Sequence, residues 1–283
     1  MTQTLLVKAP GIRKQLGHTR WVKIVLGVLF FVPPLVQSGY DPAGTSRVVS
    51  TVLAHPLSLS IPALLPLAKG LLLAVTVAAF VSRRNTSRLV LGYYALILLV
   101  VGIFQNMAFT DRYGFAWLIG NTLLQFIVAG WCLWGVFRGK MMIISRDTMN
   151  PKRLWVLLPM AIAFLFPYNF DSIQATNLVH ADFGFAMLYN DAGVTYCMVT
   201  PVLLGILIVF SSGVNSGLLS VTSFVAAGFG LLNMATWFAL QPQDWWMGVL
   251  HLPLMVLSIY GFILARGMKS AGAAQDQRQS TTT

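Results

Sequence analysis

The residue whose type and position most suggest chemistry is Lys69, a single lysine inside an apolar run. It lies in the stretch Pro66-Leu-Ala-Lys-Gly-Leu-Leu-Leu, upstream of the pair Arg83-Arg84. A charge near the middle of a bilayer costs several kcal/mol unless it is paired, hydrated or neutral. Two alternatives follow: Lys69 binds a ligand near the membrane midplane, or its helix starts at Pro66 and the lysine snorkels to the outer interface.

The partners that the sequence offers to Lys69 are neutral. No Asp lies inside an apolar run, and the chain has no Glu, so the candidates are amides or an anionic ligand. Asn106 and Asn233 both stand in an Asn-Met-Ala triplet late in an apolar run. Such amides either hydrogen-bond across helices or line a polar pocket. We therefore take Lys69, Asn106 and Asn233 as candidate ligand-binding residues.

Three histidines map to the outer half of the predicted topology, and they suggest a metal or proton site there. His180 and Asp182 form the one pair with local spacing, and His55 is the third weak candidate for a metal ligand. His251 is the only histidine that falls inside a predicted span, so we add it to the ligand-binding candidates, and a haem with two facing histidines lacks its second ligand. No cofactor is predicted, and quinone or haem are the alternatives left open.

Motifs for catalysis are missing. Cys132 and Cys197 fall at opposite ends of their spans, too far apart for a disulfide, and there is no Cys-x-x-Cys. The sequence contains no Gly-rich phosphate loop, no Ser-His-Asp set and no intramembrane carboxylate pair. Enzymatic activity stays uncertain, and the sequence leans against it.

These residues are set among long apolar stretches that recur along the chain. The composition is 57% hydrophobic and 10% charged, with a mean hydropathy of +0.73, which a soluble domain does not show. We predict an all-α, polytopic integral membrane protein with eight transmembrane helices and an uncleaved first span. The predicted spans are 21–37, 59–82, 88–109, 114–137, 153–168, 193–211, 217–240 and 245–265.

The charged residues are sorted between the gaps. Sixteen of the nineteen Lys and Arg residues cluster at the N-terminus, in two alternate loops and in the tail, whereas six of the eight Asp residues lie in the other loops. Arg47 and Arg112 are the cations of that second set of loops. The positive-inside rule then predicts a bacterial-type cytoplasmic (inner) membrane with both termini in the cytoplasm. The net charge of +11 indicates a lipid bilayer partner and no nucleic acid.

Two outer segments exceed a tight turn. The spacing of apolar residues from Arg47 to Leu53 predicts a short amphipathic helix on the membrane surface. The mixed polar segment 168–193 is either a functional loop or a simple lid over the bundle.

Several short motifs occur twice in the same order. Pro66 and Pro201 precede similar runs, the Asn-Met-Ala triplets match, and Arg138-Gly139 and Arg266-Gly267 end the fourth and eighth spans. A parallel 4+4 repeat explains this, and chance in an apolar sequence is the alternative. The predicted units are 1–20, a cytoplasmic segment; 21–140 and 150–268, two four-helix units; and 269–283, a disordered cytoplasmic tail.

The first unit resembles the DoxX/MauE group of four-span membrane proteins. The resemblance rests on one span followed by Ser38-Gly-Tyr-Asp-Pro-Ala-Gly44, an amphipathic stretch, and a Leu-rich span ending in Arg, over roughly residues 20–140. The group typically has an acidic residue where this chain has Lys69. The resemblance implies a four-helix unit that serves as an accessory subunit of membrane redox, thiol or sulfur systems.

Two functions remain. The first is a non-catalytic or accessory integral membrane subunit of a redox or assembly system, which binds other membrane subunits or forms a homo-oligomer. The alternative is a small-molecule or ion transporter with a midplane site between two four-helix halves. The absence of an acidic coupling residue weakens the transporter hypothesis.

Overall fold

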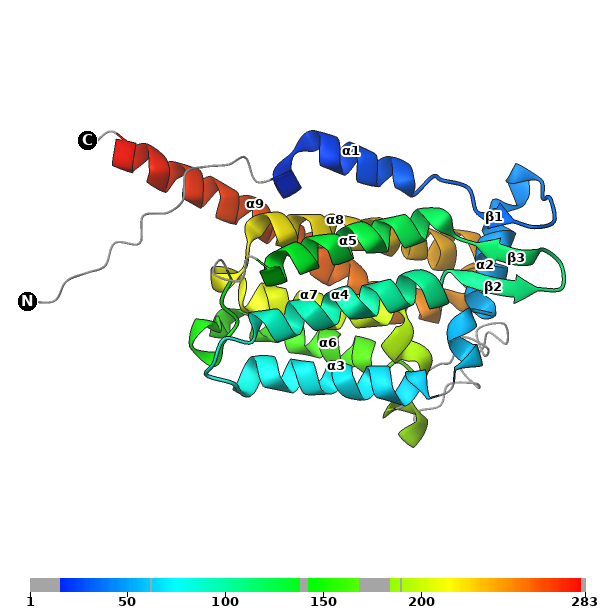
Figure 1. The fold of residues 1–283 in the computed structure, drawn as a ribbon, viewed down its shortest axis with the longest axis horizontal. Coiled ribbons are helices and arrows are strands. Elements are labelled where there is room, and N and C mark those ends of the chain that lie inside the picture. The colour runs from blue at the N-terminus through cyan, green and yellow to red at the C-terminus, as the bar shows by residue number, and fades with distance from the viewer. Residues whose placement is uncertain (1–15, 62, 138–141, 168–183, 189, 281–283) are drawn as a thin grey trace, which may run out of the picture.

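The fold is mostly helical, with a small sheet at one end of a helix bundle (Figure 1). It comes from a computed structural model that describes residues 16–61, 63–137, 142–167, 184–188 and 190–280.

Five helices are long and apolar enough to cross a membrane. They are α3 (Leu64–Val81), α4 (Ser87–Phe104), α5 (Ile119–Phe137), α8 (Ser216–Ala235, continued by a π-helical turn over Thr236–Leu240) and α9 (Trp245–Ser280). Large apolar side chains remain exposed along them, for example Val77, Leu96 and Ile263. Such a surface suits lipid, so the prediction of a helical membrane protein is confirmed at this level.

The other three predicted spans correspond to shorter helices. They are α1 (Arg20–Leu29), α6 (Leu157–Phe164) and α7 (Tyr196–Val209). The first ends early because Pro33 and Pro34 cannot continue a helix, and the chain then extends into a strand. A 3-10 helix, η5 (Pro151–Val156), leads directly into α6. Helix α7 is buried along almost its whole length, so its neighbours and not lipid surround it.

A sheet was not expected, and it corrects the all-α prediction locally. Strands β1 (Leu35–Val36), β2 (Met107–Thr110) and β3 (Gly114–Trp117) pair antiparallel in the order β1-β3-β2. The predicted spans 88–109 and 114–137 therefore each lose a few residues to a hairpin. The hairpin turns at Gly114, whose φ of +63° favours glycine.

The predicted amphipathic helix is present as α2 (Thr45–Ala54). Its buried residues Val48 and Val52 pack with Ala108 and Ala116 of the hairpin, so the apolar face covers the sheet and does not face lipid. We call β1, β2, β3 and α2 the cap.

The two ends of the bundle carry different sets of charged residues. The cap end holds Asp41, Asp111 and Asp244 together with Arg47 and Arg112. At the opposite end the loops carrying Arg83 and Arg146 are joined by backbone hydrogen bonds, such as Arg146 N–H to Ser82 O at 2.8 Å. Nearby, Lys23 lies over the ring of Phe262, which also contacts Arg266. The charge sorting in the sequence thus corresponds to two ends of the fold.

Helix α9 continues to Ser280, through most of the segment predicted as a disordered tail. The residues 271–280 are rich in Ala and Gln, which favour helix even without an apolar face.

Candidate functional site around Lys69

Lys69 lies in the second turn of α3, near its start and therefore near the cap end of the bundle. Its side chain is only 1% exposed. The Nζ atom donates hydrogen bonds to the carbonyl oxygen of Met187 and to Oδ1 of Asn190, the latter at 2.5 Å. It also lies 5.2 Å from the ring centroid of Phe164 in α6. The lysine is therefore enclosed by the protein itself and is not exposed on the outside of the bundle.

The residues around Lys69 come from the second outer segment. Two short 3-10 helices, η8 (Phe185–Leu188) and η9 (Asp191–Val194), flank Asn190. The Asn190 side chain donates to Phe166 O at 2.6 Å and accepts from Ala192 N–H at 3.3 Å. This amide is therefore held in one orientation, with its oxygen available to the lysine. The described part of the predicted lid lies directly on α3.

Close contact between η9 and α3 requires glycine at position 193. A Cβ atom added to Gly193 would lie 2.7 Å from the backbone nitrogen of Lys69. Any other residue would push the segment away from the helix and lengthen the hydrogen bonds to Nζ. Tyr93 of α4 supports the same turn from the other side, because its hydroxyl donates to Ala68 O at 2.9 Å.

A charged Lys69 ammonium without acceptors would be unfavourable at this position. A helix start carries a partial positive charge, so an ammonium in the second turn of α3 is disfavoured. Oxygen acceptors and an aromatic face offset that cost. The arrangement can fix the 184–194 segment on the bundle. Because the lysine is buried, its geometry does not make it an accessible nucleophile or base.

The two matched asparagines make similar bonds in different places. Asn106 donates to Gly102 O at 3.3 Å and to Gln125 Oε1 at 3.1 Å. Asn233 donates to Phe229 O at 2.8 Å and lies 3.4 Å from the Cys197 sulfur. Each bonds four residues back along its own helix and across to a neighbouring helix. Neither bond connects to Lys69, so the structure does not unite the three candidates in one site.

The histidines are dispersed as well. His251 is buried in α9, with Nδ1 2.7 Å from Met247 O and its ring against Phe166 and Trp237. His55 ends α2 and is exposed. His180 and Asp182 lie outside the described residues. In the part of the chain that the structure describes, no three His, Cys or Asp side chains form a group that could hold a metal.

Both cysteines are free thiols. Around them lies a set of buried hydroxyl groups in α4, α7 and α8 that the sequence did not single out. Within the described ranges, the Tyr94 hydroxyl of the first predicted half lies beside those of Tyr196 and Thr200 in the second half. The hydroxyls of Ser220, Thr222 and Ser223 have no hydrogen-bond partner there, and Ser223 faces Gly261 of α9.

Sequence reasoning missed the residues that hold Lys69. Asn190 precedes Asp191 and Gly193, and this Asn-x-x-Gly pattern signals a capped turn. Gln105 was also missed, although its Oε1 accepts from the Tyr196 N–H at 2.9 Å and joins α4 to the start of α7. In both cases the signal available in the sequence was a polar residue beside an apolar run, which indicates a side chain that bonds a helix end.

The chain was compared with family models, with curated proteins and with solved structures. No family model, no curated protein and no solved structure matches the chain.

Proposed function

We propose that this chain is a non-catalytic integral membrane subunit that acts within a redox or assembly complex. The observation that carries the proposal is that the Lys69 ammonium already has its contacts within this chain. The one cation that the sequence placed inside the membrane is surrounded by a carbonyl, an amide and a ring of the same chain. Lys69, Asn106 and Asn233 line neither the cavity beside Arg47 and Arg112 nor the one beside Trp21 and Ile127. A packed interior suits a subunit that functions through contacts made by its exposed surface.

The system in which it acts is inferred from the resemblance of residues 20–140 to the DoxX/MauE group. The exposed apolar side chains on α1 and in the turn that follows it, such as Trp21 at 73% and Phe31 at 87%, are available to lipid or to a second membrane protein. Purification from native membranes in a mild detergent tests this function. We expect other membrane polypeptides, or further copies of this chain, at fixed stoichiometry. Isolation as a lone monomer in several mild detergents would contradict it.

The proposed topology has eight crossings with both termini in the cytoplasm. The five long helices and the three shorter ones coincide with the eight apolar runs. A topology test uses Asp111→Cys and Arg84→Cys in a Cys132→Ala/Cys197→Ala background. We expect a membrane-impermeant maleimide to label position 111 from outside intact cells and position 84 only after lysis. Labelling of both from outside would overturn the topology.

We also propose that the two halves form a parallel repeat. In its support, α4 packs on α5 as α8 packs on α9, and α1 packs on α5 as α6 packs on α9. The shared i−4 bonds of Asn106 and Asn233 agree with it. The match is incomplete, because Gly205 meets Met160 closely whereas Gly70 has open space.

Transport is the second candidate, and the Tyr94, Tyr196 and Thr200 hydroxyls between the halves favour it. These hydroxyls find only one another in an apolar interior, and a polar solute or a chain of waters would satisfy their remaining hydrogen-bonding capacity. Tyr196→Phe tests it in reconstituted vesicles. Transport predicts solute or proton flux in wild type that falls in this variant, and a flux-free wild type contradicts the hypothesis.

A further inference from the structure

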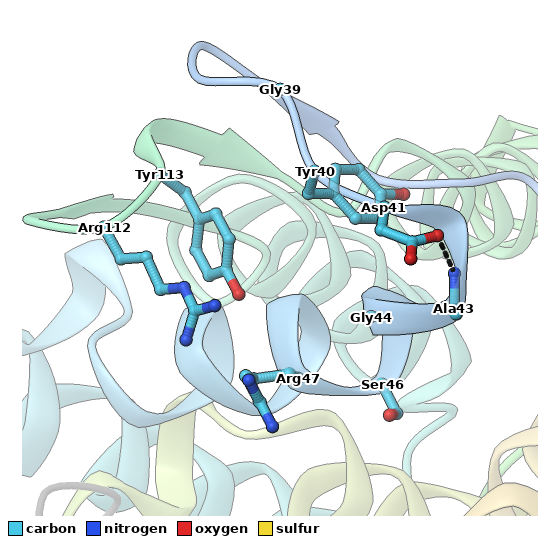
Figure 2. Close-up of a pocket in the computed structure, with 9 residues that line it drawn as sticks. All are labelled: Gly39, Tyr40, Asp41, Ala43, Gly44, Ser46, Arg47, Arg112 and Tyr113. Carbon is cyan, nitrogen blue, oxygen red and sulfur yellow. Dashed lines mark hydrogen bonds between the residues drawn. The ribbon is translucent and has the colours of Figure 1, made fainter.

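The two arginines of the outer loops meet in one cavity of the cap. Arg47 lies in the first turn of α2, and Arg112 lies in the turn between β2 and β3. Both line a cavity of about 450 Å³. Figure 2 shows the Arg112 guanidinium directed from the hairpin toward the helix that carries Arg47, beside the Tyr113 hydroxyl. Residues 65 positions apart in the sequence thus bring two positive charges to one opening.

Neither arginine is used by the fold. Among the described residues, no hydrogen bond or ion pair involves either guanidinium, and both side chains are exposed. The only interaction recorded for them is Arg112 over the neighbouring Tyr113 ring, at 5.4 Å from the centroid. Two like charges placed together repel each other, so an anion between them would lower the energy of the cap.

The acid in the cavity is already engaged. Asp41 Oδ1 accepts from the Ala43 N–H at 3.0 Å, as the cap of a short 3-10 helix, η2 (Pro42–Gly44). Figure 2 shows its carboxylate turned toward Ala43. The lining therefore keeps two positive charges against one negative charge. Arginines are unusual in loops on this side of the predicted topology, which otherwise carry Asp.

The surroundings favour an oxyanion. The two guanidinium groups are free donors of the cavity, whereas the N–H of Gly44 at the junction of η2 and α2 already donates to Asp41 O at 2.7 Å. Guanidinium groups bind phosphate and carboxylate oxygens in pairs. Tyr40 and Tyr113 form the aromatic part of the wall. A volume of this size admits a phosphate group with a small organic body.

We propose that the Arg47–Arg112 cavity binds a phosphate monoester or diester at the outer face of the membrane. The same chemistry is presented by the headgroup of an anionic lipid and by a soluble phosphate ester. The site lies in the cap, away from the buried Lys69, and the proposal does not depend on the accessory or transport function.

The test compares Arg47→Gln/Arg112→Gln with Arg83→Gln, a control that removes one exposed arginine from the opposite end of the bundle. In the lipid arm, detergent-purified protein is titrated with phosphatidylglycerol or phosphatidylcholine and bound lipid is counted by native mass spectrometry. In the soluble arm, protein in phosphatidylcholine nanodiscs is titrated with glycerol 3-phosphate or glycerol by calorimetry.

We expect preferential binding of the anionic ligand in at least one arm. Affinity should fall about tenfold for each arginine removed and stay unchanged in Arg83→Gln, since hydrogen bonds to charged groups carry about this weight. The arm that responds identifies lipid or soluble ester as the source. The variant Arg47→Lys/Arg112→Lys keeps both charges but loses the paired donors of guanidinium, so it should bind with intermediate affinity. It replaces the Gln variant in the comparison if the Gln variant is unstable. Equal affinities in the double variant and in Arg83→Gln, or no preference for the anion in either arm, would overturn the proposal.

Discussion

Lys69 and the pair Arg47 and Arg112 are cations at the same end of the bundle, in opposite surroundings. Lys69 is buried, and oxygens of the 184–194 segment accept its hydrogen bonds. The arginines are exposed and share a cavity, and their guanidinium groups make no hydrogen bond to the described residues. A charge that the fold has enclosed acts mainly on stability, whereas charges left open to solvent are available to bind. Four substitutions or conditions test that contrast.

The largest effect is expected for Lys69→Met. This variant keeps the length of the side chain, removes the side-chain donor of Met187 O and leaves Asn190 Oδ1 with the Ala192 N–H alone. We expect a loss of about 3 kcal/mol in the free energy of unfolding. Thermal unfolding in detergent measures it, with the exposed Lys152→Met as the matched control. A Lys69→Met protein as stable as the control would end the structural interpretation of this lysine.

Gly193→Ala tests the same contact from the other side. Its Cβ would press on the α3 backbone, and overpacking of this kind costs about 1–3 kcal/mol. We expect faster proteolysis within 184–194 as well as lower stability. Gly39→Ala, where a Cβ meets nothing within 4 Å, is the control. If both variants resist protease equally, η9 does not depend on the close approach.

His18 is the intermediate case, a half-buried base at the opposite end of the bundle. Burial, then Lys269 and Lys23, lowers its pKa to about 4, and its Nε2 lies 3.1 Å from Ser216 Oγ. The unfolded chain therefore takes up a proton between about pH 6.5 and pH 4 that the folded chain does not. Stability should fall as the pH drops through that window, by about 1 kcal/mol at most after solvent screening.

Unfolding midpoints at pH 7.5 and pH 5 measure this dependence. His18→Gln should make it shallower, and the buried His251 and the carboxylates account for what remains. A pH dependence unchanged in this variant would assign the effect to another group.

The smallest effect on stability is expected for Arg47→Gln/Arg112→Gln. Exposed side chains without partners change stability by no more than about 0.5 kcal/mol. The midpoint should match that of Arg83→Gln in the absence of a phosphate ester. A clear loss of stability would mean that the fold uses these arginines, and the contrast with Lys69 would disappear.

Much of the helical framework could be predicted because apolar runs and charge clusters report it directly. The helix at α2 followed from the spacing of Val48 and Val52. The hairpin could not be predicted, since Met107 to Phe109 continues the apolar composition of α4 and only the partner strands decide its pairing. The two alternatives for Lys69 differed in where its helix begins, and α3 begins at Leu64, two residues before Pro66. The enclosure of the side chain by the protein itself could not be predicted, because it depends on a segment far away in the sequence.

The candidate site was foreseen only in part. Lys69 stood out because its charge conflicts with its neighbours in the sequence, and that signal is local. The oxygens around it come from Met187 and Asn190, more than a hundred positions away, and nothing in the local pattern links them to α3. Arg47 and Arg112 raised no such conflict, since each is an ordinary loop residue until the cap brings them together.

The strand order β1-β3-β2 has a consequence for synthesis. The central strand β3 is the last of the three to leave the ribosome, and β1 has no partner until residues 114–117 have been made. The cap therefore joins two parts of the chain that α3 and α4 separate in the sequence. Arg47 and Arg112 share a cavity only after both of these helices have been synthesised.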